Sequence, residues 1–159
     1  MRLGKISVSQ INPRILIGSA VKGIDDIDYL VEQFAVNSVL SLQSDADIIN
    51  RQIDMDELVE LYQQKQIEFA RFSINDFDPD DMAIKLVRPI LHLARHVKEN
   101  KTIFVHCNAG ICRAPSTVLA YLNGYENMTL KEGLAFIRQN RPLANPYLDA
   151  IEKAIKYLK

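Results

Sequence analysis

The chain has 159 residues, about the length of one domain, of which 48% are hydrophobic and 25% are charged. Its formal net charge is −1, so it lacks the overall positive charge that is typical of nucleic-acid-binding proteins. No apolar stretch reaches the ~18 residues that cross a bilayer, and the first ten residues lack the apolar segment of a signal peptide. We therefore expect one domain, residues 1–159, with no nucleic-acid or membrane partner.

Predicted strands and helices alternate along the chain. In its first half, hydrophobic patterns predict strands over 14–18, 36–42 and 68–74 and helices over 23–35 and 53–66. In its second half, they predict a buried strand over 102–106 and helices over 80–98 (bent by Pro89), 113–125, 129–141 (capped by Thr129) and 145–158 (with Pro146 in its first turn). This alternation predicts an α/β fold, in which helices flank a mostly parallel central sheet.

The two cysteines of the chain, Cys107 and Cys112, lie close together in one segment. Small secreted domains spread their cysteines to join distant loops, whereas this pair favours a reducing compartment and thiol chemistry. We therefore expect a cytoplasmic protein. The other candidate ligands, His92, His96 and His106, do not complete a zinc site, so we predict neither a metal nor a cofactor. We interpret His92 and His96 as part of a solvated helix face.

The segment between the strand 102–106 and the helix 113–125 carries the clearest chemical signal. A loop that leaves a strand and enters a helix turns its N–H groups inward and, with the helix dipole, binds a tetrahedral oxyanion. Cys107 at the mouth of this loop lies in a positive potential that favours the thiolate, a nucleophile for phosphorus. The predicted phosphate-binding residues are Asn108, Ala109, Gly110, Ile111, Cys112 and Arg113, the last with two parallel donors.

Residues 106–113, HCNAGICR, resemble the signature of the cysteine-dependent dual-specificity phosphatases. Cys-x-Ala-Gly followed by Arg-Ala-Pro is most similar to the plant-type glucan phosphatases, which dephosphorylate starch. The segments 42–45, 75–78 and 148–151 also resemble that subfamily, so the resemblance covers most of the chain. It implies a protein tyrosine phosphatase-like fold. It also implies metal-independent hydrolysis of phosphomonoesters through a cysteinyl-phosphate, on phosphoproteins (at Tyr, Ser or Thr) or phosphorylated glucan.

The resemblance also implies a role for particular residues. Cys107 matches the nucleophile and Arg113 matches the arginine that clamps the phosphate. Asp76 matches the general acid, which protonates the leaving alkoxide and then activates water. His106 matches the residue that orients the loop and supports the thiolate, and Phe77, beside the acid, is a candidate substrate contact.

The sequence departs from the family pattern at three places. Cys112 stands where the family usually has Gly, and Ala114 stands where many relatives have Ser or Thr, although the glucan subfamily also has Ala. Residues 49–51 lack the aromatic side chains on which the glucan enzymes stack sugars. We predict that Cys112 is a redox partner that captures oxidised Cys107 as a disulfide; the alternative is a small residue that fills the inner wall of the loop.

Several charged residues have structural interpretations. Asp78, Asp80 and Asp81 are rivals of the predicted acid, but we interpret them as capping residues of the helix that follows. Arg138 and Arg141 lie at a predicted helix end, where cations interact favourably with the dipole. Attraction of an anionic substrate is the alternative for these two arginines.

Two other functions remain open at this point. One is a phosphate-binding module without turnover, although the sequence holds a nucleophile, a clamp and an acid. The other is a rhodanese-like sulfurtransferase, whose loop commonly has four residues after the cysteine, whereas five separate Cys107 from Arg113 here. The predicted partner is a phosphorylated protein or carbohydrate substrate, and the sequence makes no prediction of the oligomeric state.

Overall fold

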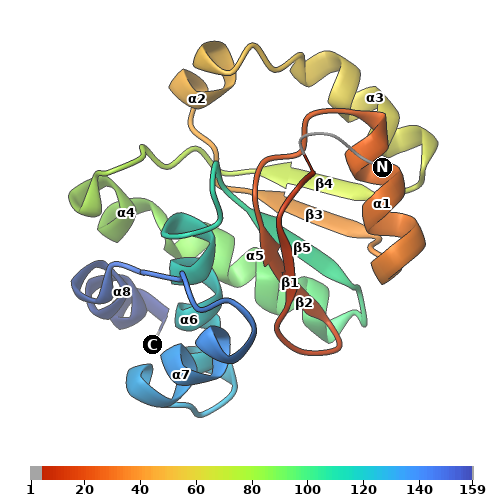
Figure 1. Cartoon of the computed structure of the whole chain (residues 1–159). Coiled ribbons are helices and arrows are strands. Elements are labelled where there is room, and N and C mark those ends of the chain that lie inside the picture. The colour runs from red at the N-terminus through yellow and green to blue at the C-terminus, as the bar shows by residue number, and fades with distance from the viewer. Residues whose placement is uncertain (1–4, 159) are drawn as a thin grey trace.

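The computed structural model describes residues 5–158. The predictions for the domain 1–159 and for the first ten residues also include 1–4 and 159, which lie outside the described residues. At the centre is a sheet with the strand order β1-β2-β5-β3-β4 (Figure 1). Its strands are β1 (Val8–Gln10), β2 (Ile15–Gly18), β3 (Ser38–Ser41), β4 (Glu68–Arg71) and β5 (Ile103–His106). β1 pairs antiparallel with β2 and the other pairs are parallel, so the predicted mostly parallel sheet is confirmed.

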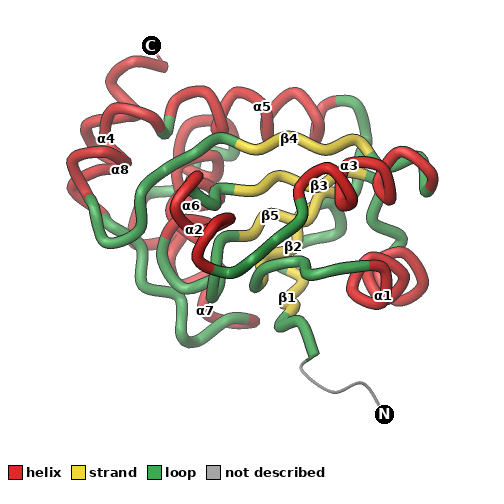
Figure 2. The backbone as a smooth tube through the Cα atoms, turned by 90° about the horizontal axis from the view of Figure 1, so that it is seen from above, coloured by secondary structure: helices red, strands yellow, loops and turns green. Residues whose placement is uncertain are grey.

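Helices pack against both faces of this sheet, as predicted. They are α1 (Ile24–Phe34), α2 (Asp45–Asn50), α3 (Met55–Gln64), α4 (Pro79–Lys85), α5 (Val87–Lys98), α6 (Arg113–Tyr125), α7 (Leu130–Asn140) and α8 (Leu148–Ile155), followed by a 3₁₀ turn, Lys156–Leu158. One buried cluster joins α1 and α3 to one face of the sheet. A second cluster joins the five helices from α4 through α8 to the opposite face. Figure 2 shows α4, α6, α7 and α8 grouped on one side and α1 and α3 on the other.

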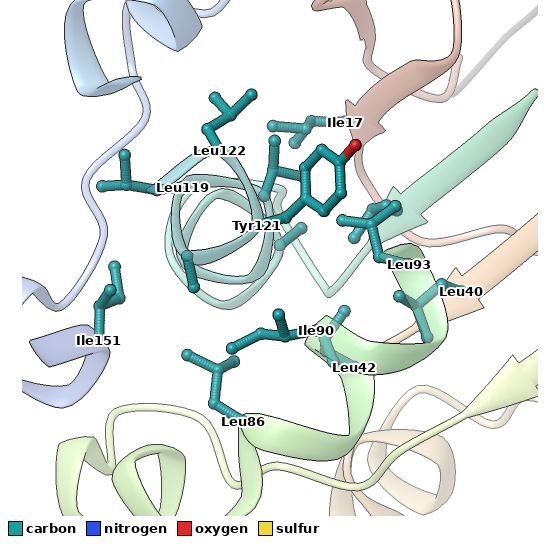
Figure 3. Close-up of a cluster of buried hydrophobic side chains, with 14 of the residues drawn as sticks. Ile17, Leu40, Leu42, Leu86, Ile90, Leu93, Leu119, Tyr121, Leu122 and Ile151 are labelled. Carbon is teal, nitrogen blue, oxygen red and sulfur yellow. The ribbon is translucent and has the colours of Figure 1, made fainter. Parts of the chain in front are cut away.

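The central strands are buried on both faces because their side chains alternate between the two clusters. The residues that pack with α1 and α3 are Leu16, Val39 and Phe104. The residues that pack in the larger cluster, part of which Figure 3 shows, are Ile17, Leu40 and Val105. β5 lies between β2 and β3, and each of its residues is buried. The loop that follows β5 therefore starts from a rigid strand.

Two predicted helices differ from those observed. The helix predicted over 80–98 is divided into α4 and α5, which meet at Leu86. Pro89 causes the break, because it has no N–H to donate to the carbonyl four residues earlier. The last helix begins at Leu148 rather than at 145, so the placement of Pro146 in its first turn is wrong. Tertiary contacts hold this segment outside the helix: Asn145 N donates to Ile111 O at 2.6 Å.

Two elements were missed by the sequence patterns. α2 follows a capping box, in which Ser44 accepts from Asp47 N and Asp47 accepts from Ser44 N. This Ser-x-x-Asp pattern is a sequence signal that could have predicted the helix. β1 has three residues and depends on its pairing with β2, so no local pattern marks it. Within residues 5–158, no helix has the length and apolar composition needed to span a bilayer.

Candidate active site

The loop between β5 and α6 contains the predicted nucleophile and phosphate-binding residues. Cys107 directly follows β5 and is 3% exposed. Within the described part of the chain, the N–H groups of residues 108–112 have no hydrogen-bond acceptor. Backbone N–H groups that lack a protein acceptor form an anion-binding site when they cluster at a helix N-terminus. The loop therefore offers donors for a tetrahedral oxyanion.

The loop is held from behind by Arg141. This buried guanidinium donates to Gly110 O at 2.6 Å, to Ala109 O at 3.0 Å and to Ser9 Oγ at 3.0 Å. The C=O and N–H of a trans peptide point in opposite directions, so the N–H groups that follow these two carbonyls, those of Gly110 and Ile111, point away from Arg141. Arg141 is at the end of α7, as predicted, but its guanidinium donates to the loop 107–112, to β1 and to β2 rather than to the last carbonyls of the helix.

Gly110 is required by the backbone of the loop. Its φ is +71°, in the left-handed region. A Cβ at this position would lie 2.5 Å from Gly18 O and 2.6 Å from Arg141 Nη2. Any other residue would therefore displace the loop, β2 or the arginine that supports it.

Arg113 is the first residue of α6 and its side chain is 1% exposed. Its Nη1 donates to Asp47 Oδ2 at 2.6 Å and to Ile74 O at 2.8 Å. Its Nη2 lies 3.2 Å from Asp76 Oδ2, and its buried Nε has no partner among the described residues. Nη1 thus fixes the guanidinium, and the Nε–Nη2 edge can bind two oxygens of a phosphate once they replace Asp76 at Nη2.

The structure distinguishes Asp76 from the neighbouring acids. Asp76 lies on the loop after β4, is about a quarter exposed and is ion-paired with Arg113. Asp78 instead accepts from Asp81 N and caps α4, as predicted. Asp81 accepts from Asn75 N and pairs with Lys85, so it serves the same helix end. Of the carboxylates on this loop, Asp76 is the one that contacts the arginine of the candidate site.

His106 and Phe77, the other two predicted site residues, have distinct surroundings. His106 Nδ1 lies 3.1 Å from Cys107 O and donates to it, because a carbonyl oxygen only accepts. Burial lowers the pKa of His106 to about 4, so the ring is neutral and its one proton is on Nδ1. Its contact is with the backbone of the loop. Phe77 follows the acid in the left-handed region, with φ of 57°, and is 85% exposed. An exposed aromatic ring beside Asp76 suits a substrate contact.

Sequence reasoning missed Asp47, which connects α2 to the site. Besides Arg113, this carboxylate accepts from Asn108 Nδ2 and Ser44 N, each at 2.9 Å. Burial raises the pKa of Asp47, but these donors outweigh burial and hold the pKa below its usual value, so the group is a carboxylate. Asn108 Oδ1 in turn accepts from Gln43 Nε2 at 2.9 Å. The network fixes both Arg113 and the start of the loop.

The surroundings of Cys112 determine its protonation state. Burial, with the nearby Cys107 and Asp76, raises the pKa of Cys112 to about 11, so it is a thiol at neutral pH.

The solvated-face interpretation is wrong for His96, which is buried and shares a 2.7 Å hydrogen bond with Ser38 Oγ. His92 is half-buried against it, with 4.0 Å between the ring centroids. No cluster of metal-binding side chains is found among residues 5–158.

Residues 29–158 match the family described as "Dual specificity phosphatase, catalytic domain". The chain belongs to this family. It is 29% identical to phosphoglucan phosphatase DSP4, amyloplastic, from Castanea sativa, over 94% of this chain and 40% of that protein. It is 24% identical to laforin from Mus musculus, over 92% of this chain and 47% of laforin. The chain thus spans less than half the length of these dual-specificity phosphatase relatives.

Solved structures support the same fold. PTPMT1 superposes with a TM-score of 0.77 at 18% identity, over 95% of this chain and 93% of that chain. Tk-PTP in its active form gives a TM-score of 0.77 at 20% identity, over 94% of this chain and 97% of that chain. The predicted protein tyrosine phosphatase-like fold is therefore confirmed.

Proposed function

We propose that this dual-specificity phosphatase domain hydrolyses phosphomonoesters through a cysteinyl-phosphate intermediate. The observation that carries the proposal is that two sets of donors follow Cys107 in the same loop and helix start. These are the N–H groups of 108–112, which have no acceptor in the described chain, and the Nε–Nη2 edge of Arg113. Together they match the oxygens of a phosphate group, and Cys107 lies where a thiolate would face phosphorus.

The first chemical step transfers the phosphoryl group to sulfur. When the phosphate oxygens take the place of Asp76 at Arg113, Asp76 takes up a proton from solvent. The Cys107 thiolate attacks phosphorus as the P–O ester bond breaks, and Asp76 gives this proton to the leaving oxygen. The N–H groups of the loop and Arg113 stabilise the charge that develops on the transferred oxygens. The N-terminal end of α6 adds a partial positive charge on the same side of the transferred oxygens.

The second step releases phosphate. Asp76, now a carboxylate, takes a proton from water, whose oxygen attacks phosphorus as the S–P bond breaks. Inorganic phosphate leaves and the Cys107 thiolate is regenerated. Asp47 and His106 act as positioning residues, because Asp47 contacts Arg113 and His106 contacts the carbonyl of Cys107.

The proposed substrates are phosphorylated carbohydrates or phosphoproteins, in line with the names of the relatives, which include phosphoglucan and tyrosine-protein phosphatases. Ile49 is 74% exposed on α2, where a glucan enzyme would have an aromatic platform, and Phe77 is the exposed aromatic ring beside the acid. The two classes are separated by comparing phosphate release from amylopectin and from phosphotyrosine peptides. A cytoplasmic location stays a prediction, and the relative from Castanea sativa is named amyloplastic.

The mechanism is tested by comparing wild type with Cys107→Ser on an aryl phosphate. We expect turnover to be lost while phosphate binding remains, since the donors are N–H groups and Arg113. Acid quenching during turnover, followed by mass spectrometry, should find phosphate on the Cys107 peptide. Turnover above a trace in Cys107→Ser would reject the cysteinyl-phosphate. Sulfur transfer from thiosulfate without phosphate release would favour the sulfurtransferase, and binding without turnover by wild type would favour a binding module.

A further inference from the structure

A second concave site lies on α5, outside the catalytic loop. It is a pocket of about 360 Å³, lined by Phe72, Arg88, Leu91, His92 and Arg95; we call it the α5 pocket. Its four α5 residues have the spacing i, i+3, i+4 and i+7, so they share one stripe of the helix. Phe72 directly follows β4 and supplies an aromatic wall.

Arg88 is held in this pocket by an aromatic ring rather than by a carboxylate. Its Cζ lies over the ring of Phe72, 5.3 Å from the centroid. No ion pair among residues 5–158 includes Arg88. A guanidinium stacked on a ring is oriented by it, while the N–H groups in its plane remain free to donate.

Arg95 is oriented by two imidazoles at the other end of the pocket. Its Nη2 lies 3.5 Å from His92 Nδ1 and 3.3 Å from His96 Nε2. Burial lowers the pKa of both rings, that of His92 to about 4, so these nitrogens are neutral acceptors. Glu68, the carboxylate near this end, is paired with Lys101 at 2.9 Å and lies 3.5 Å from His96 Nε2; it attracts Arg95 electrostatically, but no ion pair among residues 5–158 joins the two. The other N–H groups of Arg95 thus remain available.

We propose that the α5 pocket is a second anion-binding site, which takes the dianionic phosphate of a phosphomonoester. A rise of ~10 Å along the helix separates Arg88 from Arg95, a span that two arginine side chains can close around one tetrahedral ion. Phosphate presents three oxygens to two planar guanidinium groups, which is the arrangement that arginine favours. Phe72 and Leu91, the latter 47% exposed, provide apolar surface for the carbon group that carries the phosphate.

The strand register relates this pocket to the catalytic loop. Ser41 of β3 aligns with Arg71 of β4 and with His106 of β5. Phe72 and Cys107 are the next residues along, two strand spacings apart, which is ~10 Å. Phe72 and Cys107 thus lie at the same edge of the sheet, and we expect only a substrate whose two phosphates are farther apart than this backbone separation to occupy both sites. This use rests on the proposed function, whereas phosphate binding in the pocket does not.

Binding is tested by NMR titration of the Cys107→Ser protein with inorganic phosphate. We expect saturable shifts of the backbone amides of residues 88–95 in the millimolar range, separate from those of the catalytic loop. Arg88→Gln with Arg95→Gln should weaken the α5 response by about tenfold per arginine and leave the loop response unchanged. The matched control, Lys98→Gln with Lys131→Gln, removes the same charge from exposed helix positions outside the pocket.

The result that overturns the proposal is either no saturable shift in 88–95 or an equal loss of binding in the control. Thermal unfolding of both double variants, whose substituted side chains are exposed, checks that each one folds. If the catalytic loop binds phosphate but wild type has no turnover, the proposed function fails while this site stands.

The source of the phosphate is then found by kinetics on paired substrates with one or two phosphates. If the second phosphate of the substrate occupies the pocket, Arg88→Gln with Arg95→Gln should raise KM for the doubly phosphorylated substrate alone. If the ligand is a separate phosphorylated molecule, the two substitutions should leave KM unchanged for both substrates, although phosphate still shifts the α5 amides of the Cys107→Ser protein.

Discussion

Replacing Arg141 with Met tests whether one buried guanidinium sets the shape of the catalytic loop. Met keeps much of the length of the side chain and removes the donors to Gly110 O and Ala109 O, which lie at 2.6 and 3.0 Å. Hydrogen bonds from a charged donor contribute about 1.5–3 kcal/mol each, so the loss of these two should lower the free energy of unfolding by about 3–6 kcal/mol. For a protein of this size, that is a fall in Tm of roughly 6–24 °C.

The same change should lower activity beyond its effect on folding. Once the two carbonyls are released, the N–H groups of Gly110 and Ile111 lose their alignment with the transferred oxygens. Loss of one such donor typically costs about 10²–10³ in kcat, and we expect a loss of that order at a temperature well below the lowered Tm. Calorimetry and steady-state hydrolysis of an aryl phosphate give the two quantities.

The matched control is Arg138→Met, near the end of the same helix. Arg138 is exposed and donates to Ala144 O at 2.9 Å, but it does not contact the loop. The free energy of unfolding of Arg138→Met should be about 1 kcal/mol lower than that of wild type, and the variant should keep its activity. The view that Arg141 orients the loop would be refuted if Arg141→Met kept activity within twofold of wild type. It would also be refuted if Arg138→Met lost as much activity as Arg141→Met.

Three further predictions follow from the site. Asp76→Ala should slow hydrolysis of alkyl phosphates by about 10²–10⁴-fold and hydrolysis of activated aryl esters much less. A larger loss of activity in Asp78→Ala would show that Asp78, and not Asp76, is the general acid. After mild peroxide, mass spectrometry should find a Cys107–Cys112 disulfide and dithiothreitol should restore wild type but not Cys112→Ser; equal recovery without a bridged peptide would remove this role. His106 has a pKa of about 4 when folded and 6.5 as its ordinary value, so the unfolded chain binds more protons in between, and the free energy of unfolding should fall as pH drops through that range. Urea unfolding of wild type and His106→Gln should show a smaller fall in the variant.

The sequence predicted best those features whose determinants are local. The catalytic loop is recognisable because a strand, a cysteine, a glycine and an arginine follow one another within a short segment. The helix breaks because of Pro89. The break lies at Leu86, three residues before the proline, because its position depends on which carbonyl loses its donor. The start of α8 was misplaced because a contact with Ile111 decides it, and helical periodicity does not record such a contact.

The residues that support the loop were missed for the same physical reason. Asp47 and Arg113 are 66 positions apart, and Arg141 and Gly110 are 31 apart. In the sequence, Asp47 belongs to a Ser-x-x-Asp pattern and Arg141 to a predicted helix end, and neither local pattern indicates a distant partner. The fold brings Asp47 to Arg113 at the start of α6, and Arg141 to the loop after β5.

The Asp47–Arg113 contact has a consequence for the order of folding. Its partners come from opposite ends of a long stretch of chain, so it forms only after β3, β4 and β5 have paired, since long loops close late. Until then, burying Arg113 would leave an uncompensated charge, a cost of about 3–5 kcal/mol. Partly folded chains should therefore keep the N-terminal turn of α6 open to water. The complete phosphate-binding site then arises with the last cooperative step of folding rather than with early helix formation.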